Sequence, residues 1–273
     1  MTGATNGDFN MKYGPRALVL GGSEGIGAAF AEQLARRGIA LTLVGRTEAS
    51  LIETATRSHD QFGVEVAVRV LDLTAPDFVD RAAGLVAEFD YGLVIYNAGA
   101  THGAGLFLDQ PLHKALDLVA LNCTGPVAIA HHALRPMRAR GRGGLILLSS
   151  MSALGGSGYV AAYAATKSFD LLLAEGLHWE MARDGVDVLC AVATLTDTPA
   201  MARSGMNVGA SPDYSPMDPM DVATGSLDAL GRQPVWYAAG AAVADAIRTA
   251  PRVAVTDQMS RASALLFGIA VDS

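Results

Sequence analysis

The amino-acid sequence predicts an α/β fold in which a single, mostly parallel sheet of seven strands is doubly wound, with helices on both faces. Three observations predict it. Short apolar runs alternate with segments whose apolar residues recur at helical spacing. The runs are almost continuously apolar, as in strands that are covered on both faces. The first run ends in a glycine-rich turn that leads directly into a helical segment.

Each element follows from a local pattern. The apolar runs predict strands at 16–22, 39–45, 64–73, 91–99, 143–150, 186–194 and 234–240. Helical spacing predicts helices at 28–38, 48–63, 76–89, 163–185 and 221–231, and a long helical region at 110–140 that divides near 122–126. No linker, repeat or low-complexity block interrupts this alternation, so we expect one domain.

The domain is expected to occupy residues 13–273. Residues 1–12 are small and polar, and we expect them to be disordered. Residues 196–220 contain four prolines and four methionines without helical periodicity, which is typical of a substrate loop. Residues 241–271 form a helix-prone C-terminal extension broken at Pro251. We interpret its apolar end as a surface that packs on the body or on a neighbouring subunit rather than as a membrane anchor.

Composition excludes several classes of protein. The chain has 273 residues, of which 51% are hydrophobic, and a net charge of −7, so it lacks the basic excess of a nucleic-acid-binding protein. No signal-peptide pattern or membrane-spanning run is found. Cys123 and Cys190 lie in apolar stretches and are expected to be buried thiols, which fits a reducing, cytoplasmic location. No set of side chains has metal-ligand spacing, so no metal is expected.

The turn after the first strand has the sequence GGSEGIG, with glycines at Gly21, Gly25 and Gly27. Glycines let a ligand approach the main chain closely, and the helix that follows offers free N–H groups and a positive dipole end to a phosphate. At this place in a βαβ series the turn predicts a dinucleotide site, and hence a Rossmann fold. Ser23, Glu24 and Ile26 complete the expected loop contacts.

The second strand indicates which dinucleotide binds. A site for NAD usually has an acid at the end of this strand, and this chain has Gly45 followed by Arg46. An arginine can hold a 2′-phosphate, so the sequence favours NADP(H), with NAD(H) possible. Glu24 argues the other way, because it adds a negative charge near that phosphate.

The stretch GSGYVAAYAATK places Tyr163 and Lys167 four residues apart, on one face of a helix. An ammonium beside a phenol favours its ionised form, so this tyrosine can exchange a proton with a substrate. Tyr159 has Tyr163 rather than a cation four residues ahead, and we expect it to line the substrate pocket or to pack on the surface.

Further motifs join the glycine loop: Asp72–Leu73, the NAG segment at 97–99, LNCTG with Asn122, Ser150 and YAATK. Together these motifs resemble the short-chain dehydrogenase/reductase family over about residues 14–240, and look most like bacterial reductases of hydroxysteroid dehydrogenase and 3-oxoacyl reductase type. The resemblance implies a catalytic set of Asn122, Ser150, Tyr163 and Lys167. It also implies cofactor contacts, which we expect from Asp72, Leu73, Asn97, Ala98, Gly99, Tyr163, Lys167, Thr194, Thr196 and Thr198.

Two positions depart from the family pattern. Leu20 precedes the first glycine where the family usually has threonine, so a hydrogen bond that steadies the loop is absent. Ala193–Thr194 follows the sixth strand where the family usually has Pro-Gly, which affects how the nicotinamide pocket closes. Neither change removes a reacting group.

The predicted function is the NADP(H)-dependent interconversion of a hydrophobic ketone and a secondary alcohol, of steroid-like, terpenoid or aromatic type. Small and apolar residues around the pocket favour such a substrate, with Ser150, Ser152, Tyr159 and Met201 as its contacts. One alternative is a 3-oxoacyl thioester reductase, and another is a protein that senses NADP(H) without turnover. The resemblance implies a homodimer or homotetramer. Trp179 is expected either at that interface or in intrachain packing.

Overall fold

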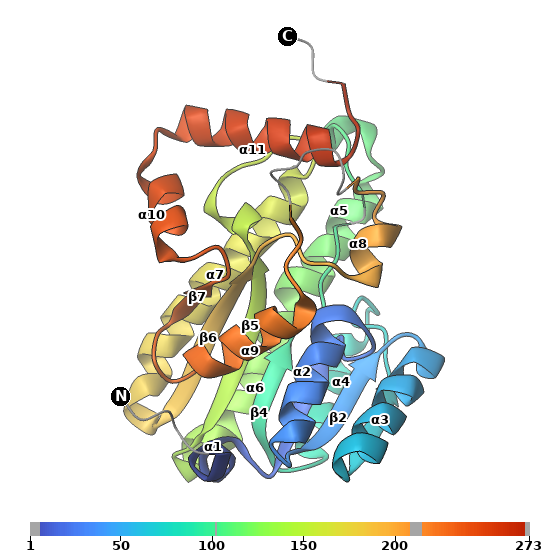
Figure 1. The fold of residues 1–273 in the computed structure, drawn as a ribbon, viewed down its shortest axis with the longest axis vertical. Coiled ribbons are helices and arrows are strands. Elements are labelled where there is room, and N and C mark those ends of the chain that lie inside the picture. Colours follow the sequence, from blue (N-terminus) through green and yellow to red (C-terminus); the bar gives the residue numbers. More distant parts are fainter. Residues whose placement is uncertain (1–5, 102, 208–214, 271–273) are drawn as a thin grey trace.

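A computed structural model describes residues 6–101, 103–207 and 215–270, and it confirms the predicted α/β architecture. Seven parallel strands form one sheet in the order β3-β2-β1-β4-β5-β6-β7. The strands are β1 (Arg16–Leu20), β2 (Ala40–Gly45), β3 (Val66–Val70), β4 (Tyr91–Tyr96), β5 (Gly143–Ser150), β6 (Val186–Ala193) and β7 (Val235–Tyr237). The order reverses between β1 and β4, as in a doubly wound sheet (Figure 1).

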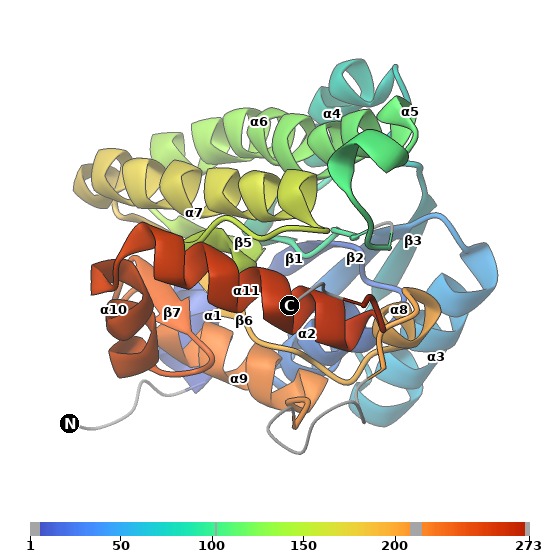
Figure 2. The same cartoon turned by 90° about the horizontal axis from the view of Figure 1, so that it is seen from above.

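Helices cover both faces of the sheet (Figure 2). One face carries α2 (Gly25–Arg36), α3 (Glu48–Phe62) and α9 (Pro219–Ala229), and the other carries α4 (Phe78–Ala87), α6 (Gly125–Arg140) and α7 (Ala161–Met181). Each layer has its own apolar core against the sheet. The central strands β1 and β4 are buried along their whole length, which explains their continuous apolar sequence.

The N-terminal segment differs from the expectation of disorder. Residues 6–12, which we expected to be disordered, form most of helix α1 (Asn6–Tyr13). Phe9 and Tyr13 pack on the core, and the Tyr13 hydroxyl donates to Asp187 Oδ2 over 2.5 Å. Asn10 Nδ2 donates to the Arg37 carbonyl. This helix is therefore held by tertiary contacts, which local propensity does not reveal.

Shorter elements connect these layers. Between β4 and α6 lie η1 (Phe107–Asp109), α5 (Leu112–Val119) and a turn of π-helix, η2 (Ala120–Thr124). Two short 3₁₀ helices, η3 (Met151–Leu154) and η4 (Ala182–Asp184), lie on either side of α7. None of the described helices is long and apolar enough to cross a membrane.

The segment between β6 and α9 and the two C-terminal helices lie at the end of the sheet where the strands have their carboxyl ends (Figure 1). Within the predicted substrate loop, α8 (Pro199–Arg203) is helical and Thr196 bridges to Met217, while residues 208–214 lie outside the described part. The chain then ends in α10 (Ala241–Thr249) and α11 (Arg252–Leu266), separated by Pro251 (Figure 1).

Candidate active site

The predicted catalytic residues come from three elements that meet at the carboxyl end of β5. Ser150 ends β5, Asn122 lies in η2, and Tyr163 and Lys167 lie on α7. Two hydrogen bonds hold α7 against this edge of the sheet. Ser149 Oγ donates to the Lys167 carbonyl over 2.7 Å, and Ser168 Oγ donates to the Ala153 carbonyl over 2.7 Å.

Lys167 is buried, and its ammonium has two partners. Nζ donates to the Leu148 carbonyl over 2.7 Å and to Asp170 Oδ2 over 3.0 Å. The pairing of β4 with β5 ends at Leu147, so Leu148 offers the next carbonyl along the strand. The side chains of Lys167 and Asp170 are only 6% and 3% exposed, so this is a buried ion pair.

The two charges of this pair stabilise each other against the cost of burial. Burial lowers the pKa of Lys167, but the charges of Asp170 and Tyr163 and the hydrogen bond with Asp170 outweigh it, so the pKa lies above its ordinary value. Burial raises the pKa of Asp170, and the charge of Lys167 opposes that shift. Asp170 Oδ1 is buried with no hydrogen-bond partner. The carboxylate therefore depends on Lys167 for compensation.

Asn122 is fully buried, and its Nδ2 donates to Thr166 Oγ1 over 3.0 Å. Thr166 precedes Lys167, so this bond joins η2 to α7 beside Lys167. The Tyr96 hydroxyl donates to the Leu121 carbonyl over 2.7 Å and so fixes the π-helical turn. A Cβ on Gly99 would lie 3.1 Å from Lys167 Nζ and 3.4 Å from Asn122 Oδ1. The absence of a side chain there leaves room beside both polar groups.

Ser150 and Tyr163 are half-buried and accessible from the carboxyl edge of the sheet. Ser150 Oγ accepts from the Ser152 N–H over 3.2 Å, which orients its hydroxyl at the start of η3. Tyr163 lies one turn before Lys167, in the first turn of α7. The structure thus brings the four predicted catalytic residues to one region.

The glycine loop has the form of a phosphate cradle. Gly21 and Gly25 have φ values of +79° and +55°, which other residues rarely adopt. The N–H groups of Gly21 and Gly22 donate to the Val44 carbonyl, and Asn97 Nδ2 donates to the Gly21 carbonyl over 2.9 Å. These bonds hold the loop although Leu20 replaces threonine. No side chain caps the start of α2, so its N–H groups are available to a phosphate.

The predicted contacts after β6 lie next to this cradle. Thr198 caps α8 by accepting from the Met201 N–H, and a Cβ on Gly25 would lie 2.9 Å from Thr198 Cγ2. Thr194 and Thr196 lie on the segment that leads to α8, where Thr196 Oγ1 donates to the Thr194 carbonyl. Arg203 of α8 forms a two-bond ion pair with Glu24, one bond being 3.1 Å between Nη1 and Oε2. Glu24 is therefore neutralised within the chain.

Arg46 and Asp72, which we expect at the adenosine end of the cofactor, are both exposed. The Thr74 N–H holds the pKa of Asp72 below its ordinary value, with smaller contributions from the Thr74 hydroxyl and the Arg46 charge and with burial opposing them. Ser23 and Ala98 are partly exposed beside the loop, and Ile26 packs partly against the core. Leu73 is 5% exposed and packs into the core, so its side chain is not available to a ligand.

The predicted substrate side is built by the segment before α7 and by α11. Tyr159 has a φ of +65°, the single left-handed backbone conformation outside glycine among the described residues. Its carbonyl accepts from the Gly105 N–H, which ties the chain after β4 to this wall. Met201 of α8 is buried, and Ser152 is half-buried beside Ser150.

Helix α11 covers this wall from above (Figure 2). Ser260 Oγ accepts from the Gly158 N–H over 2.7 Å, and Ser157 Oγ donates to the Met259 carbonyl. A Cβ on Gly155 would lie 2.8 Å from Met259 Sδ. Gly155 and Gly158 thus allow α11 to pack closely against this wall.

Sequence reasoning missed Asp170 and the Arg203–Glu24 pair. Asp170 follows Lys167 by three residues, a helical spacing that indicates contact and could have revealed it. Arg203 and Glu24 are 179 residues apart, and no local pattern connects them.

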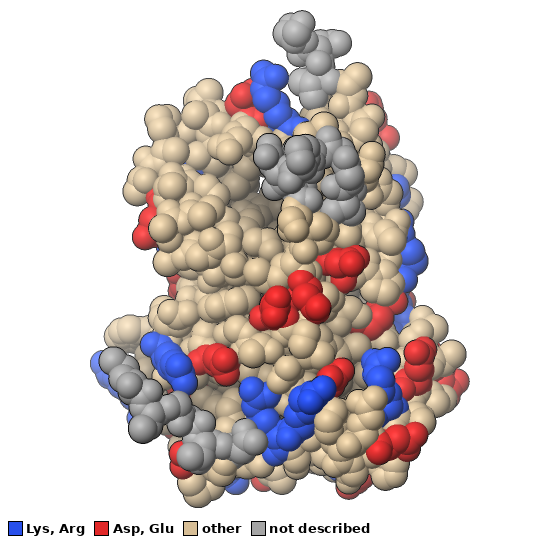
Figure 3. All heavy atoms as spheres, viewed as in Figure 1, with Lys and Arg blue, Asp and Glu red and all other residues tan. Residues whose placement is uncertain are grey.

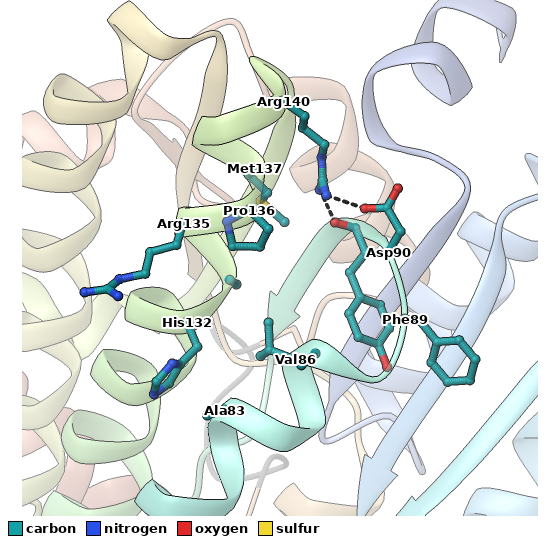
Figure 4. A pocket seen from close by; sticks show the side chains of 12 residues that line it. Ala83, Val86, Phe89, Asp90, His132, Arg135, Pro136, Met137 and Arg140 are labelled. Atoms are coloured by element: carbon teal, nitrogen blue, oxygen red, sulfur yellow. Dashed lines mark hydrogen bonds and ion pairs between the residues drawn. The ribbon is translucent and has the colours of Figure 1, made fainter.

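A groove of about 480 Å³ lies elsewhere, between α4 and α6. Figure 4 shows its lining, with Arg140 turned toward Asp90 and Arg135 directed away from that pair. It lies near the start of β4, at the opposite end of the sheet from Ser150. It holds none of the predicted catalytic residues.

The fold and this arrangement of residues define a nucleotide-dependent oxidoreductase of the doubly wound α/β class. Residues 15–208 match the short chain dehydrogenase family, and the chain belongs to it. The chain is an oxidoreductase of this family, and its relatives include hydroxysteroid dehydrogenases, which act on CH–OH and C=O groups.

One relative by sequence and two solved structures are similar to this chain within that family. The chain is 31% identical over 233 residues to a 7beta-hydroxysteroid dehydrogenase of Clostridium sardiniense, covering 85% of this chain and 88% of that protein. A solved structure from work on 7beta-hydroxysteroid dehydrogenase stereoselectivity superposes with a TM-score of 0.83 at 26% identity, covering 92% and 98% of the two chains. A short-chain dehydrogenase from Sphingobium yanoikuyae in complex with NADPH superposes with a TM-score of 0.78 at 30% identity, covering 85% and 91%.

Proposed function

We propose that this protein is an NADP(H)-dependent reductase that interconverts a bulky hydrophobic ketone and its secondary alcohol, with Tyr163 as the proton donor. The observation that carries the proposal is the position of Lys167, buried and docked against β5 one helical turn from Tyr163. A buried charged lysine is costly and needs compensating partners, and ionisable groups held in this way are concentrated at functional sites.

NADP(H) fits the residues present. The cradle formed by Gly21, Gly25 and the start of α2 suits a pyrophosphate, and the exposed Arg46 suits a 2′-phosphate. Glu24 no longer argues against that phosphate, because Arg203 neutralises it. The NADPH complex of the Sphingobium yanoikuyae relative supports the same choice. The bound cofactor would supply the hydride.

The chain's own residues supply the remaining chemistry. The hydroxyls of Ser150 and Tyr163 orient the carbonyl oxygen and stabilise the negative charge that develops on it. Tyr163 then gives its proton to that oxygen, and the Lys167 ammonium favours the phenolate that remains. Asn122 and Thr166 hold the face of α7 on which Lys167 lies.

The substrate class follows from the uncharged surroundings of the site. Figure 3 shows few charged side chains around the hollow below α11. The described arginines of α8, α10 and α11 have partners within the chain: Glu24 for Arg203, Glu175 for Arg248, the Leu154 carbonyl for Arg252 and Asp257 for Arg261. A carrier protein or a coenzyme thioester needs free cations near the pocket, so this surface favours a neutral hydrophobic ketone. The 7beta-hydroxysteroid dehydrogenase relatives support a steroid-like one.

The test is turnover of a ketone panel with NADPH and with NADH, followed by cofactor absorbance. The panel holds steroid, terpenoid and bulky aromatic ketones together with 3-oxoacyl thioesters. We expect turnover of free bulky ketones with a preference for NADPH. Turnover of thioesters alone would indicate the acyl reductase, and NADPH binding without any turnover would indicate a sensor. Either result would contradict the proposal.

We further propose that the enzyme is a homodimer assembled through α5 and α7. Large apolar side chains are exposed along these adjoining helices: Leu112 and Leu116 on α5, and Leu172 and Trp179 on α7, which are 57–69% exposed. Trp179 is 68% exposed although Arg183 lies over its ring, so intrachain packing leaves most of it uncovered. Exposed large apolar side chains on adjoining helices are typical of a subunit interface, and a second copy presents the same helices.

A further inference from the structure

We propose that Asp170 is a positioning residue, which keeps the Lys167 ammonium charged and fixed against β5 and thereby sets the pH range over which Tyr163 donates its proton. The inference rests on the proposed function, because it assigns Tyr163 the role of acid.

The geometry makes Asp170 the counter-ion of Lys167. Asp170 Oδ2 lies 3.0 Å from Lys167 Nζ, and the carbonyl oxygen of Leu148 on β5 lies 2.7 Å from the same nitrogen. Both side chains are almost completely buried, so water screens neither charge. A buried lysine without such a partner tends to lose its proton.

Asp170 also opposes the effect of Lys167 on Tyr163. Tyr163, Lys167 and Asp170 lie at positions i, i+4 and i+7 of α7, so they share one face of the helix. The lysine favours the phenolate, and the carboxylate behind it disfavours the phenolate. Asp170 therefore keeps the Tyr163–Lys167 pair fully protonated to higher pH, which is the state needed for ketone reduction.

Other titratable groups around the pair do not replace this charge. Tyr96 of β4, Cys123 of η2 and Cys190 of β6 interact electrostatically with Asp170. Burial, assisted by Asp170, raises the pKa of each of them, to about 11 for the Cys123 thiol, so all three are neutral at pH 7. Glu175, further along α7, is 3.4 Å from Arg248 and balanced by it. Among the described residues, Asp170 is thus the anion that governs the pair.

The magnitude follows from the helix. Seven residues at 1.5 Å each separate Asp170 from Tyr163 by about 10 Å, and a unit charge at that distance in a protein interior moves a titration by about one pH unit. Removing the negative charge makes the Tyr163–Lys167 pair release its first proton at lower pH, whichever of the two groups gives it up.

The experiment is the pH profile of kcat/KM for ketone reduction by wild type, Asp170→Asn and Asp170→Glu. In Asp170→Asn we expect the alkaline fall in activity to begin about one pH unit lower, and in Asp170→Glu we expect the wild-type profile to be restored. Asp187→Asn is the matched control, because Asp187 pairs with Tyr13 and Lys12 at the opposite end of the sheet. Its profile should match the wild type.

A profile of Asp170→Asn that superimposes on the wild type would overturn the proposal. If the wild type shows no turnover, the proposed function fails, but tyrosinate absorbance still tests Asp170. Subtracting the absorbance of a matching Tyr163→Phe variant isolates the signal of Tyr163. This signal should appear about one pH unit lower in Asp170→Asn than in the protein with Asp170. Should Asp170→Asn not fold, Lys167→Met/Asp170→Asn is expected to fold, since both charges leave together. If the double variant also does not fold, Asp170 has a packing role, and the proposal is overturned.

Discussion

Gly27 has no room for a side chain, and its replacement by alanine tests the glycine loop as a cofactor site. A Cβ at this position would collide with the Gly21 carbonyl oxygen and would lie 2.7 Å from Asn97 Nδ2. The obstacle is backbone, which cannot rotate away, so the loop must move. Overpacking of this kind costs about 1–3 kcal/mol of unfolding free energy.

The larger expected effect is on NADPH binding. The displaced loop carries the N–H groups at the start of α2, and loss of one hydrogen bond to a charged group costs about 1.5–3 kcal/mol, or at least about tenfold in Kd. The assay is fluorescence titration of NADPH, with thermal melting of the same samples. Gly84→Ala in α4 is the control, because nothing lies within 4 Å of its added methyl and alanine stabilises a helix interior by about 0.5–1 kcal/mol. If folded Gly27→Ala binds NADPH with wild-type affinity, the assignment of the glycine loop as the cofactor site is refuted.

Three further variants probe the cofactor and the interface. Arg46→Gln should weaken NADPH binding at least about tenfold in titrations and leave NADH unchanged, since one charge-assisted hydrogen bond is lost; equal losses for both would contradict a phosphate contact. Arg203→Gln should weaken NADPH binding because Glu24 is left unneutralised, and Arg203→Gln/Glu24→Gln should recover it; no recovery would contradict that reason. Leu172→Glu should give a monomer by light scattering, and a persistent dimer would exclude the α5–α7 face.

The sheet and the Tyr163–Lys167 pair could be predicted from the sequence because both depend on local patterns. Apolar runs such as β5 need only their own residues to be recognised, and Tyr163 and Lys167 reveal their shared face by spacing alone. Helix α1 could not be predicted, since it depends on Phe9 and Tyr13 packing on the core. The π-helical turn that carries Asn122 also escaped prediction, because it is fixed by a hydrogen bond from Tyr96 of another element.

Long-range contacts explain the remaining differences. The sequence suggested that Glu24 opposes a 2′-phosphate, and only the folded chain shows Arg203 beside it. No local pattern explains the glycines before Tyr159, and only the folded chain shows that they make room for α11. In both cases the decisive partner lies more than 90 residues away.

The central claim is that Tyr163, and not Tyr159, donates the proton. Its most direct measurement is kcat for NADPH-dependent reduction of the best ketone by Tyr163→Phe and Tyr159→Phe, with NADPH affinity confirming that each variant is folded. We expect Tyr163→Phe to lose about 10²–10⁴-fold in kcat, the usual contribution of a general acid, and Tyr159→Phe to change mainly KM. A Tyr163→Phe enzyme with wild-type kcat would contradict the account.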